Sequence, residues 1–249
     1  MTSVEIAAII FCCLCVGALA GMRLRAILPK HHLDSDTKDL IKLGVGLIGT
    51  MSALVLGLLV ASTKNAYDTK QSELAVMAGN VILLDQVLAH YGTETSDARA
   101  ALRTTVVGME AGGSRNRLAQ LGRAARVDRE GLFDKIQSLT PQADAQRTLK
   151  SEAESLALTL GQTRWLLFAQ SGTSISTPFL VIVIFWLTVL YLSFGLFAPS
   201  NLTALTTLVV SALSVAGAMF LILDLDHPFS GLMQIPDTPL RNALMALEK

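Results

Sequence analysis

The most distinctive pattern in this chain is a run of 59 residues without a charged side chain. Asp, Glu, Lys and Arg are absent from Trp165 to Leu223. A water-soluble domain would place several charges in such a stretch, because its surface must be hydrated. Ala198–Asn201 supplies a turn near the middle and leaves two apolar segments, 178–197 and 202–223. At ~1.5 Å per helical residue, each segment can cross a hydrocarbon core ~30 Å thick, so the pattern predicts a transmembrane hairpin.

The first quarter of the chain repeats this arrangement. Residues 6–22 and 43–63 are both free of charged side chains, and further apolar residues extend the first run to Leu28. The arginines inside that extension can direct their charged ends toward the membrane surface. We therefore predict two more membrane helices, at about 4–28 and 43–63, and four in total.

The segment between the two pairs has a different character. Lys64 to Arg164 contains 13 basic and 12 acidic residues, so it is hydrated and nearly neutral. Apolar residues recur at helical spacing and form a seam at Leu74, Met77, Val81, Leu84 and Leu88. A second seam of three- and four-residue steps follows at Leu149, Ala153, Leu156, Leu160 and Thr163. These seams predict an all-α extramembrane domain of three or four helices, continuous with the membrane helices.

Helix boundaries within this domain follow from turn and cap residues. Tyr91-Gly92 should end the first helix, and Thr95–Asp97 should cap the second, which Gly112-Gly113 would close. Thr140-Pro141 has the sequence of an N-cap followed by a first-turn proline, so we expect the last helix to begin there. No period-two pattern of useful length predicts a strand.

These patterns together predict an all-α integral membrane protein with four transmembrane helices and a helical extramembrane domain between helices 2 and 3. We expect the membrane helix pairs at 1–63 and 176–223, the helical domain at 64–175 and a C-terminal tail at 224–249.

Composition supports a membrane protein and points to no further class. Hydrophobic residues make up 51% of the chain and charged residues 16%, below the ~25% usual in soluble domains. The net charge is zero, so the overall balance indicates no nucleic-acid partner. Cys12, Cys13 and Cys15 lie on different faces of the first membrane helix and serve best as small apolar residues.

Two membrane helices carry stripes of small or hydroxyl-bearing residues. In the second helix, small residues recur on one face at Gly46, Thr50, Ala53, Gly57 and Ala61. In the fourth, hydroxyl groups recur at Thr203, Thr207, Ser211 and Ser214. Such stripes commonly allow close packing of helices within a bundle. Alternatively, one of them lines a water-filled path in an oligomer, where hydroxyl groups are tolerated.

Polar residues gather at two membrane boundaries. Asp224, Asp226 and His227 follow the fourth helix and are candidate contacts for a cation or a pore mouth, although acids also commonly mark where a helix leaves the lipid. The link 31–36 contains histidines and aspartates at loose spacing, but its acids can cap the second helix. We predict neither a metal site nor a cofactor. The sequence has no phosphate loop, nucleophile elbow or zinc-protease motif, so we do not expect an enzyme.

A family resemblance covers nearly the whole chain. It is carried by Leu28–Thr37, Ile41–Thr50, Ala53–Ser62, Tyr67–Thr69, Leu83–Asp85, Ala89–Gly92, Asp224–Gly231 and Pro239–Arg241. These residues resemble a bacterial family of four-helix membrane proteins that is described as bestrophin-like and catalogued as a domain of unknown function. The resemblance implies a multi-pass protein of a bacterial inner membrane.

A more distant similarity connects the chain to bestrophin channels. Val55–Gly57 resembles the valine-leucine-glycine of the bestrophin pore helix, and Pro228-Phe229 with Gly231 resembles the motif after the last bestrophin helix. This similarity implies a pentameric homo-oligomer with both termini in the cytosol, and it places a candidate pore neck at Thr50, Leu54 and Leu58. No aromatic residue occupies these neck positions, in contrast to the bestrophin pattern.

Two functions are compatible with these features. The first is an oligomeric ion channel, in which the stripes face a shared pore, the helical domain extends it and inorganic ions are the ligands. The second is a non-conducting membrane scaffold or sensor that engages partners through its helical domain. A ring-forming proton channel is disfavoured, because no acid or histidine lies in the middle of a predicted membrane helix.

Overall fold

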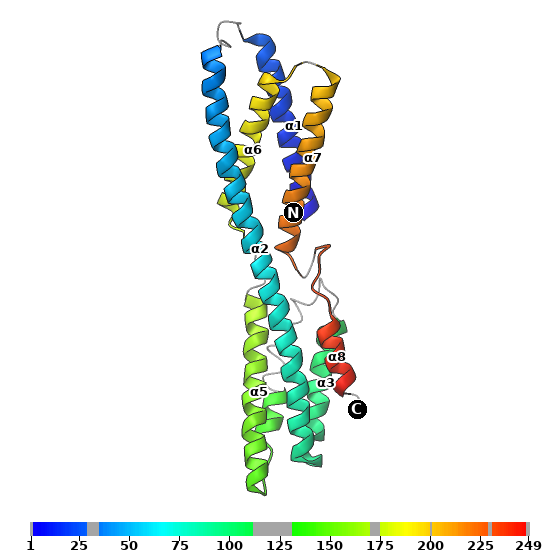
Figure 1. Ribbon diagram of the computed structural model, residues 1–249. Helices are drawn as coiled ribbons and strands as arrows, with labels where there is room; N and C mark the ends of the chain where they lie inside the picture. The colour runs from blue at the N-terminus through cyan, green and yellow to red at the C-terminus, as the bar shows by residue number, and fades with distance from the viewer. Residues whose placement is uncertain are drawn as a thin grey trace. The chain divides into compact units, whose positions relative to one another are not determined.

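The computed structural model describes residues 2–28, 35–111, 131–169, 175–199, 201–228 and 231–247. All regular secondary structure in these ranges is helical, which confirms the predicted fold class. The chain forms two compact units (Figure 1). The first comprises Met1–Ala66 with Ser174–Asp226, and the second comprises Tyr67–Thr173 with His227–Lys249.

Four helices are long and apolar enough to cross a membrane, as predicted. They are α1 (Ser3–Ile27), α2 (Ser35–Tyr91), α6 (Thr177–Phe197) and α7 (Leu202–Leu225). Three of them begin with residues that favour a helix start. Thr2 and Glu5 form a capping box at the start of α1, a proline lies in the first turn of α6, and the Asn201 side chain accepts a hydrogen bond from the Ala204 N–H at the start of α7.

In the first unit, α1 packs against both α6 and α7 (Figure 1). Its core is apolar and includes Ile10, Leu14, Val183, Leu187 and Ala212, all of which are buried. At the end of α1, the Arg25 guanidinium donates a hydrogen bond to the Ala198 carbonyl in the turn between α6 and α7. This contact joins the first helix to the hairpin formed by the last two.

The second unit is built on the part of α2 that follows Ala66. The predicted seam residues, Leu74 to Leu88, are all buried, which confirms that the helix continues well beyond the charge-free stretch 43–63. The core also includes residues from α3 (Ser96–Ala111), helical residues 131–136, α5 (Asp144–Ala169) and α8 (Thr238–Leu247). Helix α8 buries Leu240, Ala243 and Leu247, so the tail contributes to this core.

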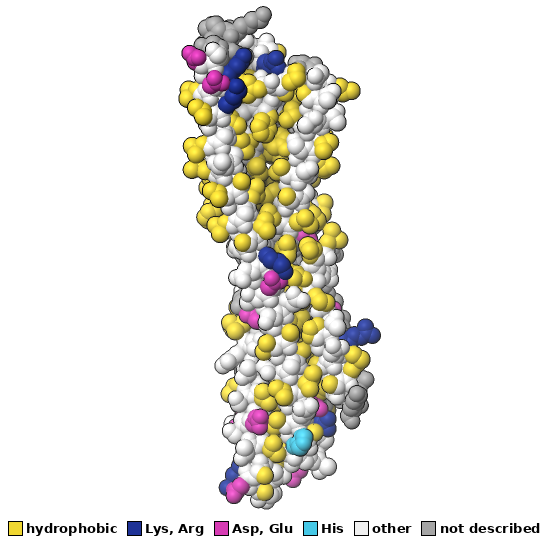
Figure 2. All heavy atoms as spheres, in the orientation of Figure 1, with side chains coloured by type: hydrophobic (Ala, Val, Ile, Leu, Met, Phe, Trp, Pro, Cys, Tyr) yellow, Lys and Arg dark blue, Asp and Glu magenta, His cyan; other side chains and the backbone are white. Residues whose placement is uncertain are grey.

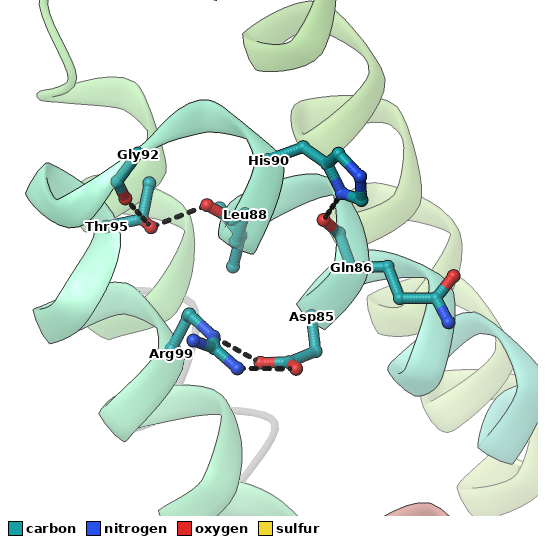
Figure 3. Close-up of polar contacts among 7 residues, drawn as sticks. All are labelled: Asp85, Gln86, Leu88, His90, Gly92, Thr95 and Arg99. Atoms are coloured by element: carbon teal, nitrogen blue, oxygen red, sulfur yellow. Dashed lines mark hydrogen bonds and ion pairs between the residues drawn. The ribbon is translucent and has the colours of Figure 1, made fainter. Parts of the chain in front are cut away.

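The corner between α2 and α3 is fixed by backbone conformation and polar contacts (Figure 3). Gly92 has φ +136°, a value that side-chain-bearing residues rarely adopt, and it ends α2 as predicted. The Thr95 hydroxyl lies 2.6 Å from the Leu88 carbonyl oxygen and 2.8 Å from that of Gly92. One turn further, the Arg99 Nε and Nη2 groups donate to the two carboxylate oxygens of Asp85 at 2.7 and 2.8 Å.

The prediction that Thr140-Pro141 begins the last extramembrane helix is wrong, because α5 begins at Asp144. The preceding residues are held by other contacts. The Lys150 ammonium donates to the carbonyls of Gln137 and Leu139 at 2.6 and 2.9 Å. The Gln142 N–H donates to the Gln146 side chain at 2.8 Å and takes the place of the expected threonine cap.

Candidate functional site

The membrane part of α2 presents a long outer face that no described residue of its unit covers. Leu54 and Leu58 are 74% and 66% exposed, and they lie beside the small-residue stripe, to which Thr50 belongs. All five stripe residues are themselves exposed: Gly46, Thr50, Ala53, Gly57 and Ala61. A Cβ atom added to Gly46 or Gly57 would meet no atom within 4 Å. Within one chain, this stripe therefore lies on the exposed side of α2.

The opposite face of α2 makes the contacts with the bundle. Ser52 is 2% exposed and Thr63 is 1% exposed, and each hydroxyl donates to the carbonyl four residues earlier. Apolar residues of this face pack on the core at Val45, Ile48, Val55, Leu56 and Leu59. In its most apolar stretch, α2 has only 6% of its residues buried, against 33–39% in the other three membrane helices. This helix has by far the largest uncovered surface.

Most of the buried side chains in the first unit are apolar. Ile10, Leu14, Val183 and Ala212 have no exposed surface at all, and Met219 is 1% exposed. Apolar side chains offer an ion no polar replacement for its hydration shell.

The hydroxyl stripe of α7 divides into two parts. Ser211 is half-buried and accepts a hydrogen bond from the Tyr191 hydroxyl of α6 at 3.1 Å. Thr203, Thr207 and Ser214 are exposed. The hydroxyls of Thr207 and Ser214 donate to carbonyls four residues earlier, at 2.9 and 3.0 Å. Ser211 thus packs two helices of the bundle together, and the exposed hydroxyls of Thr207 and Ser214 are bonded to their own helix.

The acidic residues at the end of α7 are not solvated side chains. Asp224 is 2% exposed and Asp226 is 4% exposed, and both take part in interactions. His227 is half-buried and also has an interaction partner. These two buried acids lie at the end of α7, which runs to Leu225. Among the described residues, no group of three or more His, Cys, Asp or Glu is placed to hold a metal ion.

Comparison with known families agrees with this arrangement of helices. A Bestrophin-like domain matches residues 12–240 and so includes α2, α6 and α7 and most of α1. The chain belongs to the Bestrophin-like family. No curated protein and no solved structure matches it.

Membership of this family, together with the four apolar helices, makes the chain a multi-pass integral membrane protein. Figure 2 shows hydrophobic side chains covering much of the visible surface around the membrane helices, with charged side chains gathered near one end of them. This distribution is the one expected of a helical bundle whose sides face lipid.

The Bestrophin-like domain also contains a helix contact that the sequence analysis missed. Gly17 and Gly21 of α1 are buried against α6, and Gly195 of α6 is buried against α1. A Cβ atom on Gly17 would lie 2.9 Å from the Thr188 carbonyl oxygen, and one on Gly21 would overlap the backbone at Leu192. The four-residue spacing of Gly17 and Gly21 was the signal for this contact.

Some of the predicted sites lie outside the described residues. His31 and His32 of the first link fall in the range 29–34, and Phe229 falls in the range 229–230. The described part of the first link begins at Ser35, and Lys42 pairs with Asp39 at 3.0 Å in the first two turns of α2.

Proposed function

We propose that this Bestrophin-like protein is an oligomeric ion channel of a bacterial inner membrane, with the outer face of α2 directed toward an axis shared by several copies. The observation that carries this proposal is the exposure of that face. Leu54 is 74% exposed, whereas Ser52 on the other side of the same helix is 2% exposed. An uncovered helix in a bundle whose other helices pack together is a natural surface for contact between copies.

The chemistry of the face suits a narrow apolar constriction. Thr50, Leu54 and Leu58 recur every four residues, so copies arranged around an axis would place them in successive rings. The Thr50 hydroxyl donates to the Leu47 carbonyl at 2.8 Å, which leaves its methyl group and the two leucines as the main surface. A hydrophobic constriction of this kind can gate ion flow by excluding water when it narrows.

The small residues beside the neck would determine how closely the copies approach. Ala53, Gly57 and Ala61 follow the small-x-x-x-small pattern and occupy the exposed face next to Leu54. In lipid, such residues favour association because they let helix backbones come into van der Waals contact. The same helix would therefore supply both a contact between neighbours and a lining. The number of copies expected from the bestrophin resemblance is five.

Single-channel recording from purified protein in planar bilayers tests the proposal. Leu54→Trp should reduce the unitary current, because its larger side chain would narrow the path. Leu213→Trp is the matched control, since Leu213 is also an exposed leucine (62%) but lies on α7. Currents that are reduced equally by both variants would argue against a pore along α2.

Absence of current has a separate meaning. If folded protein is silent across voltages, monovalent salts and divalent ions, the channel proposal fails and the scaffold or sensor function is favoured. Measuring the mass of the particle in native nanodiscs then shows whether the outer face of α2 still joins copies, because a monomer would leave that face to lipid alone.

A further inference from the structure

Helix α5 changes its surface chemistry along its length. Its first part, 144–154, exposes the charged side chains of Asp144, Arg147 and Glu152. Its last part, 155–169, exposes no charged side chain, because the one charged residue there, Arg164, is 4% exposed. The helix therefore begins with a surface suited to water and ends with an uncharged one.

The uncharged end of α5 carries large apolar side chains on its surface. Leu158, Trp165 and Leu166 are 53%, 57% and 48% exposed. Positions 158 and 165 are two helical turns apart and therefore lie on one face of the helix. The Trp165 ring also lies beside that of Phe168, with 5.6 Å between the two centroids. Exposed apolar groups gathered in this way mark a contact surface for an apolar or interfacial partner.

The position of this surface in the sequence indicates which partner covers it. Trp165 is the first residue of the charge-free run, which continues through α6 to Leu223. Residues 170–176 alone separate the end of α5 at Ala169 from the start of α6 at Thr177. A connection of this length spans less than about 30 Å even when fully extended, so α5 has to end close to the bilayer that α6 enters. The apolar phase within reach of these side chains is therefore the lipid.

We infer that the end of α5 rests in the headgroup region of the bilayer, with Trp165 and Leu166 in contact with lipid and the charged first part of the helix in water. Indole rings are favoured at this boundary because their body is apolar and their N–H group is polar. Apolar faces of interfacial helices lie ~5–10 Å into the boundary between headgroups and acyl chains. This contact does not depend on ion conduction, and it gives the second unit a lipid contact of its own.

Trp165 reports this contact directly. The chain has two tryptophans, and the other, Trp186, lies in α6. A Trp186→Phe variant in phosphatidylcholine nanodiscs leaves the fluorescence of Trp165 alone. Phospholipids brominated near the headgroup end of their acyl chains should quench most of this emission, and those brominated near the chain ends should quench less. Iodide, which stays in water, should quench little of it.

Two control variants calibrate the quenching. Trp165→Phe leaves Trp186 alone, which lies within a membrane helix and should be quenched by both brominated lipids. Glu152→Trp, combined with Trp165→Phe and Trp186→Phe, moves the indole to the charged part of α5. Position 152 is exposed, so this substitution should not disturb the fold. The emission of this variant should be quenched by iodide and unaffected by either lipid.

Three results would overturn the inference. Strong quenching of Trp165 by iodide, without quenching by lipid, would place the end of α5 in water. Protection from both iodide and lipid would show that protein covers this surface, as in a contact with a second copy. Stronger quenching by bromine near the chain ends would place Trp165 in the hydrocarbon core instead of the headgroup region.

Discussion

A Cβ atom placed on Gly195 of α6 would fall on the carbonyl group of Ala18 in α1. The backbones of the two helices are therefore in direct contact at this point. Because lipid provides no hydrophobic force between membrane helices, close packing of this kind is a main source of their association. The contact makes α1 and α6 the central pair of the first unit, with α7 packed on α1.

We expect Gly195→Ala to destabilise the bundle by about 1–3 kcal/mol, since the added methyl group must displace a backbone and cannot be accommodated by a side-chain rotation. Gly44→Ala is the matched control, because a Cβ atom at Gly44 meets nothing within 4 Å. The Gly44→Ala substitution should leave the stability unchanged or raise it slightly, because alanine has a higher helix propensity than glycine. Thermal unfolding of both variants in bicelles measures the difference, and equal midpoints would contradict the close contact.

The Asp85–Arg99 pair should contribute measurably to the second unit. The Asp85 side chain is 11% exposed, and removal of its partner would leave a carboxylate in a largely desolvated position. We expect Arg99→Met to cost about 1–3 kcal/mol, and the double variant with Asp85→Asn to cost less than the sum of the single changes. Arg147→Met is the control, since Arg147 and Asp144 form an ion pair that is 69% and 94% exposed. Its effect should be close to zero.

This pair should be insensitive to pH in the neutral range. The hydrogen bonds to Asp85 raise the pKa of Arg99 above its ordinary value, although partial burial opposes this effect. A group whose pKa is raised on folding loses its contribution only as the pH rises through the folded-state pKa, which is far above neutral here. The cost of Arg99→Met should therefore be constant between about pH 6 and 9. A penalty that changes across this interval would indicate another titrating group.

Tyr91→Phe should increase stability. The Tyr91 hydroxyl is buried and has no hydrogen-bond partner among the described residues, so its removal relieves a desolvated polar group, and we expect a gain of about 1 kcal/mol. Burial, together with the negative charge of Glu94, also raises the pKa of Tyr91 above its ordinary value of 10.0.

The raised pKa predicts an alkaline effect with a definite sign. Above pH 10.0 the phenol ionises more readily in the unfolded chain than in the folded protein, so wild-type stability should fall as the pH rises from there through the folded-state pKa. The Tyr91→Phe variant should lack the fall in stability that ionisation of Tyr91 causes, whereas the Tyr67→Phe variant should show the same fall as the wild type. Unfolding midpoints between pH 9 and 11 are the measurement. Parallel curves for the two variants would refute the assignment.

Cysteine cross-linking tests which face of α2 meets another copy. In a background where Cys12, Cys13 and Cys15 are replaced by alanine, Leu54→Cys should form disulfide-linked dimers when membranes are oxidised. Ser52→Cys, on the face that is 2% exposed, should not. A disulfide requires Cα atoms within about 7 Å, so cross-linking reports close approach. The reverse pattern would place the contact between copies on a different helix.

The four membrane helices could be predicted because their signal is local. A run without charges such as 43–63 needs no partner to be recognised, and the apolar seam from Leu74 to Leu88 indicates that helical structure continues beyond it. The start of α5 could not be predicted in this way. The Gln142 N–H finds its acceptor in the Gln146 side chain, which local cap preferences at Thr140-Pro141 did not indicate.

The sequence also could not predict which stripe of small residues is buried within one chain and which is exposed. Small residues at 46–61 and at 17–21 have the same chemistry, yet the first set is exposed and the second is buried against α6. Which set packs inside one chain depends on how all the helices are arranged, and spacing within one helix does not contain that information. Burial of Asp224 and Asp226 has the same origin, since it depends on neighbours that are distant in sequence.

The hydroxyl groups of α7 have a consequence for how this helix enters the bilayer during synthesis. Three hydroxyl groups donate to backbone carbonyls of the same helix, those of Thr206, Thr207 and Ser214. The acceptors of these hydrogen bonds are therefore part of α7 itself. Residue-based insertion scales assign each hydroxyl group an unfavourable free energy for losing its contact with water. Because these bonds form as soon as the helix does, the cost of partitioning α7 from the translocon into lipid should be lower than its amino-acid content indicates.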